Sequence, residues 1–455
     1  MNWQQILKPK NLYFWVTVLI SNMSAFTSGT HLVWLVPVMP ILKAEKTPQE
    51  NPFKKAITPN QEAWIWASFS LGAIIGPPLA AFTVDKIGRK NTLMRCVAVP
   101  YFVSFLILGF SELVFLYYIG RLLGGFALGN FFVTLPMYLG EISQLSLRGK
   151  VLSLINLFQC LGVLFSLFVG PRLSITSYAF LCSLIPAAFF IIFSGFFDTP
   201  YFYLSRGNIS EAEKVLMKLR NATQEEVKDE LEMLQVAIEN EREENISFKQ
   251  LCIRLMMTRE LFMTMGLMAF QQCTGSELEG SVVTEISAEL TGCIYGAIQV
   301  LASIVAPFII DRTGRKLLLF ISGMGMMISN FGEGVYFFSR KHNIKSVDQK
   351  SWLGILSLIL FQVAFNIGFG PVPWVIVGEI FQPTIKKIAI MVTVTFCWSV
   401  NLLVSYFFPI ITHILGNYYV SWIFALICVL AVFFTQLFVI ETKDMNLGQK
   451  VGSNK

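Results

Sequence analysis

Long apolar runs alternate with short polar turns along almost the whole chain. Each run is long enough, at roughly 20 residues, for one helix to cross the hydrocarbon core of a bilayer. A soluble helical protein would instead show narrow apolar stripes at helical spacing. The pattern predicts an all-α membrane protein with twelve transmembrane helices, at residues 13–37, 61–84, 92–110, 113–136, 150–170, 177–197, 259–278, 290–310, 317–338, 352–380, 388–413 and 418–440.

The longest polar stretch, residues 198–258, divides the spans into two sets of six. Its leucines and valines recur at helical spacing after a capping pattern that begins at Ser210, so the stretch is predicted to form linker helices. The expected organisation is an N-terminal six-helix half (1–197), the linker helices, a C-terminal six-helix half (259–440) and a tail (441–455).

Composition and charge agree with this organisation. The chain is 54% hydrophobic and 14% charged, against about 25% charged in soluble domains. The Lys and Arg residues lie mainly in segments on the side of the two termini, so both termini and the linker are predicted to be cytoplasmic. The net charge of +6 forms no continuous patch, which argues against a nucleic-acid partner and leaves the lipid bilayer as the expected environment.

A charged turn occurs once in each half. Asp85-Lys86-Ile87-Gly88-Arg89-Lys90 follows the second span, and Asp311-Arg312-Thr313-Gly314-Arg315-Lys316 follows the eighth. An acid closes the fourth span and another the tenth, and bases follow each. Ion pairs between these helix ends would form a latch that opens with a change of conformation. The predicted latch residues are Asp85, Gly88, Arg89, Glu141, Arg148, Asp311, Gly314, Arg315 and Glu379. The alternative is that these bases only anchor the topology.

These motifs resemble those of the sugar porter family of the major facilitator superfamily, which includes glucose facilitators and insect trehalose transporters. Further matches are Gly120-Arg121, Asp198-Thr199-Pro200, Gln271-Gln272, Gly370-Pro371-Val372-Pro373-Trp374 and Glu441-Thr442-Lys443. The resemblance covers nearly the whole chain. It implies the major facilitator fold, with two six-helix halves, a central site that opens alternately to each side, and a place in the plasma membrane.

The resemblance also implies where a sugar would bind. Gln271 and Gln272 match the family's sugar-binding pair, Asn156 stands where the fifth span usually has a glutamine, and Trp374 matches the tryptophan of the tenth span. Amides donate and accept hydrogen bonds, and aromatic faces suit the C–H side of a sugar ring. The full predicted set is Gln271, Gln272, Asn156, Glu277, Trp374, Trp398, Asn401, Asn366 and Gln299. The alternative role for the amides is hydrogen bonding between helices.

Some residues depart from the family pattern. Glu277 stands where the family has an asparagine, and Tyr201 stands where it has an arginine. The first span carries no Asp or Glu, although proton-coupled relatives usually have an acid there. Facilitated diffusion is therefore the simpler mechanism. Proton symport through Glu277 or Glu333, and a sensor that binds sugar without transporting it, are the alternatives.

The expected function is thus facilitated transport of a hexose or trehalose by alternating access. The chain has no G-x-x-x-x-G-K-S/T loop for ATP and only three histidines. Enzymatic activity, a cofactor, a metal and an obligatory protein partner are not expected, and the expected ligand is a small sugar. His31 and His413 are interpreted as packed polar residues.

Overall fold

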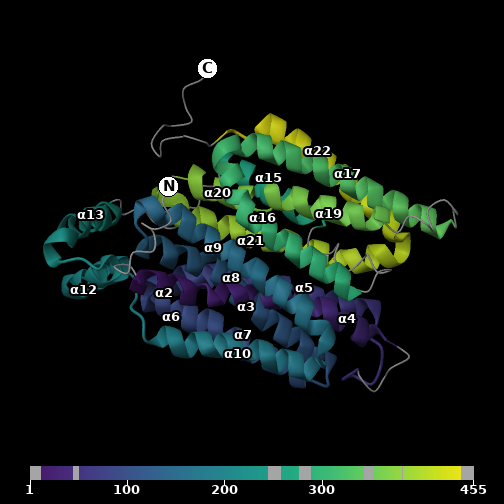
Figure 1. The fold of residues 1–455 in the computed structure, drawn as a ribbon, viewed down its shortest axis with the longest axis horizontal. Coiled ribbons are helices and arrows are strands. Elements are labelled where there is room, and N and C mark those ends of the chain that lie inside the picture. The colour runs from purple at the N-terminus through teal and green to yellow at the C-terminus, as the bar shows by residue number, and fades with distance from the viewer. Residues whose placement is uncertain are drawn as a thin grey trace.

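The computed structural model describes residues 12–44, 51–243, 258–275, 288–342, 352–381 and 383–441, and all regular structure among them is helical. The helices form two groups that lie side by side (Figure 1). The N-terminal group consists of α2 (Leu12–Ser21), α3 (Met23–Val33), α4 (Leu35–Lys43), α5 (Pro59–Ile87), α6 (Arg89–Thr92), α7 (Val99–Phe110), α8 (Val114–Ile142), α9 (Leu145–Val169) and α10 (Ile175–Ser194). The C-terminal group consists of α15 (Arg259–Cys273), α16 (Ala288–Thr313), α17 (Arg315–Lys341), α19 (Trp352–Ile367), α20 (Val372–Ile380), α21 (Pro383–Leu415) and α22 (Asn417–Phe438).

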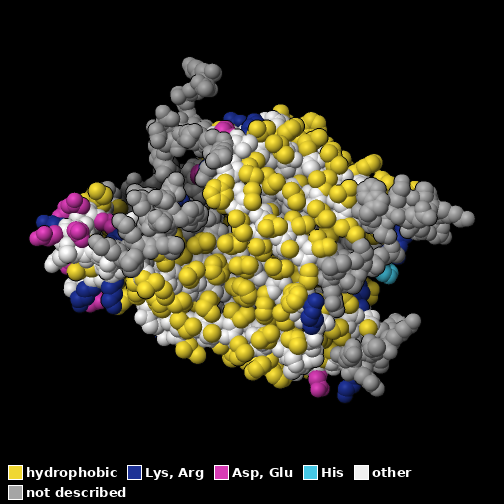
Figure 2. All heavy atoms as spheres, viewed as in Figure 1, with side chains coloured by type: hydrophobic (Ala, Val, Ile, Leu, Met, Phe, Trp, Pro, Cys, Tyr) yellow, Lys and Arg dark blue, Asp and Glu magenta, His cyan; other side chains and the backbone are white. Residues whose placement is uncertain are grey.

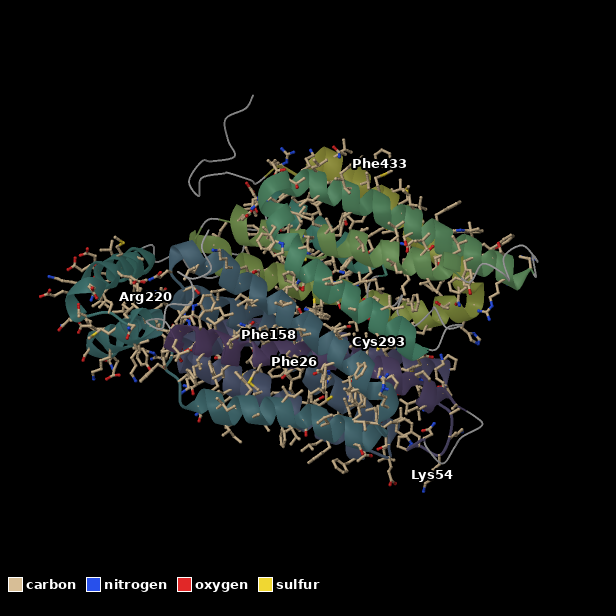
Figure 3. The ribbon with its side chains drawn as sticks, in the orientation of Figure 1. Phe26, Lys54, Phe158, Arg220, Cys293 and Phe433 are labelled. Carbon is tan, nitrogen blue, oxygen red and sulfur yellow. The ribbon has the colours of Figure 1, made fainter. Side chains whose placement is uncertain are left out.

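Eleven stretches of the described chain are long and apolar enough to cross a membrane. Together with the shorter α15, they occupy the twelve positions that the hydrophobic pattern predicts. Apolar side chains cover the visible face of the two groups, and charged side chains gather towards the ends (Figure 2). Phe433 of α22 points away from the bundle (Figure 3) and is 61% exposed. A surface of this kind suits lipid and not water.

Three helices follow α10 and pack at one end of the bundle, which we call the linker end. They are α11 (Pro200–Ser205), α12 (Ile209–Arg220) and α13 (Gln224–Glu243). The sequence placed the helix start at Ser210, but Asn208 caps α12 by accepting a hydrogen bond from the Glu211 amide at 3.3 Å. Asn is an equally good cap because its side-chain oxygen reaches the same unpaired amides.

Two arginines fix the linker helices to the N-terminal group. Arg206 donates from Nη2 to the carbonyl oxygen of Lys86 at 2.6 Å, at the end of α5. Arg220 donates from Nη1 to the carbonyl oxygen of Ile142 at 2.8 Å, at the end of α8, and pairs with Glu230. Both arginines satisfy carbonyls that the helix termini leave without intrahelical partners.

At the end of the bundle opposite the linker helices, the two groups approach closely. A Cβ placed on Gly296 of α16 would lie 2.9 Å from Cα of Leu164 of α9. Trp64 of α5 also meets Tyr406 of α21 edge-on, with ring centroids 5.3 Å apart. Small residues allow such backbone contact between membrane helices, so the absence of a side chain at Gly296 sets the distance between α9 and α16.

We expect Gly296→Ala to weaken this contact, while Gly292→Ala serves as the matched control. A Cβ on Gly292 would lie 3.5 Å from Cβ of Leu167, which is an ordinary contact. The Gly296 variant should lose about 1–3 kcal/mol of stability through overpacking, and the control should stay close to wild type. Thermal unfolding of the two purified variants in detergent measures the difference. Equal stability of both variants would contradict the close contact.

Candidate functional site

Gln271 lies near the end of α15 and reaches a break in the tenth span. Its Nε2 donates to the carbonyl oxygens of Phe369 at 2.8 Å and Gly370 at 2.7 Å. These residues separate α19 from α20, where Pro371 offers no amide hydrogen. The Phe369 amide is satisfied instead by Ser322 Oγ of α17, at 3.0 Å. The break therefore turns main-chain carbonyls towards Gln271.

Gln272 belongs to a hydrogen-bonded chain that crosses from one helix group to the other. Asn401 of α21 donates from Nδ2 to Gln272 Oε1 at 2.8 Å, and Gln272 donates from Nε2 to Cys397 Sγ at 3.1 Å. Asn401 Oδ1 accepts a hydrogen bond from the hydroxyl of Ser70, which belongs to α5. All of these side chains are buried.

Aromatic rings surround these amides. Trp398 lies one helical turn before Asn401 and meets Phe69 of α5 edge-on, with ring centroids 6.1 Å apart. Phe132 of α8 stacks on Trp374 of α20 at 5.0 Å and also contacts Trp398. Each aromatic contact joins the N-terminal group to the C-terminal group, so the site lies at the contact between the two groups.

Two buried polar atoms in this site have no hydrogen-bond partner among the described residues. They are Oε1 of Gln271, an acceptor, and Nε1 of Trp398, a donor. An unpaired buried polar atom is costly. A ligand hydroxyl suits either atom, because a hydroxyl both donates and accepts.

The remaining predicted ligands are Asn156, Asn366, Gln299 and Glu277. Asn156 of α9 is exposed and accepts a long contact from Cys160 Sγ, at 3.9 Å. Asn366 donates to a carbonyl of its own helix, that of Gln362, at 2.8 Å. Gln299 of α16 keeps a buried Oε1 without a described partner. Glu277 lies outside the described residues.

At the linker end, an arginine and a glutamate join neighbouring helices of the N-terminal group. Arg89 donates from Nε to Glu141 Oε1 of α8 at 2.9 Å, and its guanidinium lies 5.0 Å from the Tyr201 ring centroid. The second oxygen of Glu141 accepts a short hydrogen bond from Thr199 Oγ1. Asp85 contacts Arg89 at the longer distance of 3.8 Å.

Asp198 completes this network at the charged turn. Gly88 has a φ of +92°, and a Cβ there would lie 2.0 Å from Oδ2 of Asp198. The carboxylate accepts from the amides of Arg89 at 3.1 Å and Lys90 at 3.2 Å, at the start of α6. Burial raises the pKa of the Asp198 carboxyl above its ordinary value, while hydrogen bonds from backbone amides act against this rise.

The C-terminal group repeats the arrangement. Arg315 binds Glu379 of α20 with two contacts, Nη2 to Oε1 at 2.7 Å and Nε to Oε2 at 3.3 Å. Glu441 accepts from the amides of Arg315 at 2.9 Å and Lys316 at 3.1 Å. Gly314 has a φ of +93°, which favours glycine, and so repeats the part that Gly88 plays.

Two predicted latch residues remain. Arg148 of α9 lies against Gly140, since a Cβ on that glycine would be 2.9 Å from Nη2 of Arg148. Arg148 is therefore near the turn of α8 that carries Glu141. Asp311 falls within α16, but its side chain is outside the described part of the chain.

A buried arginine and histidine form a further polar group that the sequence did not single out as a site. Arg121 of α8 donates from Nη1 to the carbonyl oxygen of His31 at 3.0 Å and lies 4.1 Å from the Phe69 ring centroid. The His31 ring hydrogen-bonds through Nε2 to Ser104 Oγ at 2.7 Å. The sequence signals were the match of Gly120-Arg121 to the family motif and the position of both residues in apolar runs, where polar residues are functional candidates.

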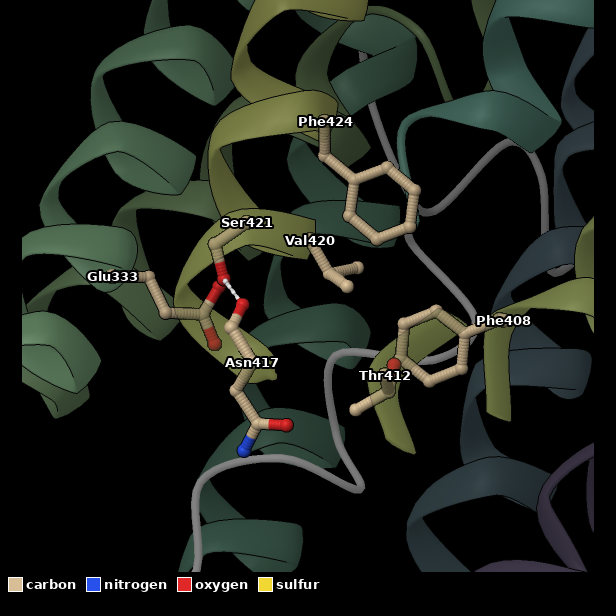
Figure 4. A pocket seen from close by; sticks show the side chains of 7 residues that line it. All are labelled: Glu333, Phe408, Thr412, Asn417, Val420, Ser421 and Phe424. Atoms are coloured by element: carbon tan, nitrogen blue, oxygen red, sulfur yellow. Dashed lines mark hydrogen bonds between the residues drawn. The ribbon is translucent and has the colours of Figure 1, made fainter. Parts of the chain in front are cut away.

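Glu333 lies in a separate small pocket of the C-terminal group. The carboxylate comes from α17 and faces Ser421 of α22, with Thr412, Asn417 and Phe424 around it (Figure 4). None of Gln271, Gln272, Trp374, Trp398 and Asn401 lines this pocket. Glu333 therefore does not share the central site.

Apolar spans around a polar group, at the contact between two similar helix groups, define a multi-pass membrane transporter. A family model described as "Sugar (and other) transporter" matches residues 25–449. The chain belongs to this sugar transporter family.

Among its relatives, the facilitated trehalose transporter Tret1 of Anopheles gambiae is 30% identical over 448 residues, covering 96% of this chain and 56% of that protein. Tret1 of Apis mellifera ligustica is 32% identical over 406 residues, covering 86% and 79%. The chain thus spans little more than half the length of the mosquito relative.

Solved structures with a similar fold include the xylose transporter XylE from E. coli. Its partially occluded inward open conformation gives a TM-score of 0.80 at 23% identity and covers 95% of this chain and 99% of that chain. XylE bound to 6-bromo-6-deoxy-D-glucose gives 0.76 at 22%, covering 96% and 98%. This likeness shows the major facilitator fold that the sequence resemblance implied.

We expect Glu141→Gln to destabilise the protein more than Glu379→Gln. The Glu141 side chain is 15% exposed and also binds Thr199, whereas that of Glu379 is 33% exposed. Loss of charged hydrogen bonds at Glu141 should cost about 1.5–3 kcal/mol, and loss at the more exposed pair about 0–1 kcal/mol. Chemical unfolding in detergent measures both values. A larger loss at Glu379 would refute this ranking.

Proposed function

We propose that this protein moves a neutral sugar, trehalose or a hexose, across the membrane by facilitated diffusion. The observation that carries the proposal is the group formed by Gln271, Gln272 and Asn401 beside Trp374 and Trp398. Amides beside tryptophan faces suit a ligand with hydroxyl groups on its edge and C–H groups on its face. The group lies where the two helix groups meet, as alternating access requires.

The names of the insect relatives favour trehalose, and the chemistry of the site accommodates a hexose equally well. Asn156, Gln299, Asn366 and Glu277 remain proposed ligands of the same sugar. In the conformation described, Phe132 covers one face of Trp374. A sugar that stacks on this tryptophan would use its other face or displace Phe132.

Facilitated diffusion is favoured because the described first span, from Leu12 to Lys43, carries no Asp or Glu. Arg121 is buried and contacts the main chain and ring of His31, which belongs to this span. Glu333 lies in its own pocket, apart from the central amides. These placements offer no acidic group in the first span for a proton that travels with the sugar.

The two helix groups would act as the moving halves, with no enzymatic step and no obligatory protein partner. The linker end would face the cytoplasm, with both termini on that side of the plasma membrane. The networks of Arg89 and Arg315 would then be the cytoplasmic latch. The contact at Gly296 lies at the other end, so this conformation would be closed on the outer side.

Uptake of labelled trehalose and labelled glucose into proteoliposomes tests the proposal. We expect saturable uptake of at least one sugar, with no dependence on an imposed pH gradient. Gln271→Ala and Gln272→Ala should each reduce kcat/KM on the order of 10-fold or more, which corresponds to the loss of one to two hydrogen bonds.

Asn330→Ala is the matched control. Asn330 is a buried amide of α17 that hydrogen-bonds to Cys428 and lies outside the central group, so uptake should stay close to wild type. Uptake driven by a pH gradient would show a proton symporter. Sugar binding without uptake, in correctly folded protein, would show a sensor. No binding and no uptake of either sugar would reject the proposal.

A further inference from the structure

One hydrogen-bonded chain in the central site begins outside the C-terminal group. Ser70 lies on α5, in the N-terminal group, and its hydroxyl donates to Asn401 Oδ1. Asn401 in turn donates to Gln272 Oε1. A hydroxyl of one group therefore acts, through one intermediate amide, on a proposed sugar ligand of the other group.

This chain fixes the orientation of both amides. The Asn401 oxygen accepts hydroxyl hydrogens from Ser70 and from Ser405, the latter at 3.2 Å. Only the Asn401 nitrogen is then suited to face Gln272, which must present its oxygen. The Gln272 nitrogen consequently faces the Cys397 sulfur, a weak acceptor.

Gln272 keeps capacity for a ligand in this orientation. An amide oxygen accepts two hydrogen bonds and an amide nitrogen donates two. Among the described residues, Gln272 uses one of each, which leaves one acceptor site and one N–H. Binding is tighter when such groups are held in place before the ligand arrives, because less conformational entropy is lost on binding.

We infer that Ser70 is a positioning residue that orients Gln272 for the sugar through Asn401. The inference rests on the proposed function. Ser70 and Asn401 belong to different helix groups, so the positioning exists only while α5 and α21 are in contact at this level. Separation of the groups breaks the chain at the Ser70 hydroxyl and loosens the Gln272 amide. The affinity for sugar is thereby tied to the conformation of the transporter.

Aromatic side chains near Ser70 also join α5 to α21. Phe69 precedes Ser70 on α5 and meets Trp398, which lies one turn before Asn401 on α21. Phe69 also carries the Arg121 guanidinium on its face, at 4.1 Å. Behind the contact between α5 and α21, the buried Arg121 of the N-terminal group therefore packs on Phe69.

Ser70→Ala tests the inference, with Ser68→Ala as the matched control. Ser68 is a buried hydroxyl on the same helix, but it donates to the Trp64 carbonyl of its own helix. The measurement is equilibrium exchange of labelled trehalose and glucose in proteoliposomes, with KM and kcat determined separately. Ser70→Ala should raise KM by roughly 5- to 10-fold, the value of one net hydrogen bond. Its kcat should stay near wild type, and Ser68→Ala should change neither value.

A double-mutant cycle separates positioning from loss of packing. If Ser70 acts through Asn401, Ser70→Ala should add little to the KM of Asn401→Ala. Ser70→Cys leaves no cavity, weakens the donor and should also raise KM, which covers the case in which the alanine variant folds poorly.

The inference would be overturned by an unchanged KM in Ser70→Ala. It would also be overturned if the effects of Ser70→Ala and Asn401→Ala on KM multiplied. In both cases, sugar exchange by the wild-type protein would still support the proposed function. Absence of exchange in the wild-type protein would reject the proposed function itself, and the inference with it.

Discussion

Hydrocarbon offers no partner for a polar group, so every polar side chain within the bundle must find one in the protein. The structure meets this constraint in two places. Charged residues gather at the linker end, where Arg89 and Arg315 bind glutamates and helix carbonyls. Amides also bind each other at the contact between the two helix groups, as Gln272 and Asn401 do. At Gln271 Oε1 this satisfaction is incomplete among the described residues, and this atom belongs to the proposed sugar site.

The two end networks are built from the same parts in the same order. A glycine with positive φ turns the chain, the next residue is an arginine that binds a glutamate of a neighbouring helix, and a second acid caps the helix that follows. Asp198 and Glu441 fill this last position, although they lie at the end of one half and at the start of the tail. Asp198 begins the motif Asp198-Thr199-Pro200, and Glu441 begins Glu441-Thr442-Lys443. Their shared role explains why each charged turn has one such motif later in the chain.

Much of this arrangement was predictable from the sequence, and the reason is physical. Spans of about 20 apolar residues have few alternative structures, and a glycine before an arginine at a helix end has a readable turn chemistry. The ion pairs of Arg89 and Arg315 follow from it. The contacts of Ser70 and of His31 could not be predicted, because a single hydroxyl or imidazole in an apolar run carries no spacing signal. Their partners, Asn401 and Arg121, lie far away in sequence and meet them only after the helices pack. The exposure of Asn156 likewise depends on helix rotation, which no local pattern fixes.

The two networks differ in burial, and this difference has a mechanical consequence. Arg89 holds Glu141 beneath the linker helices, with Thr199 as an additional donor and Tyr201 on the guanidinium face. Glu379 accepts two contacts from Arg315 and is more exposed than Glu141. Water can replace part of an exposed ion pair, so opening it costs less than opening a buried one. Arg206 and Arg220 also tie the linker helices to α5 and α8, which stiffens the N-terminal end network further. In the proposed latch, the C-terminal network should therefore open at lower cost than the N-terminal network.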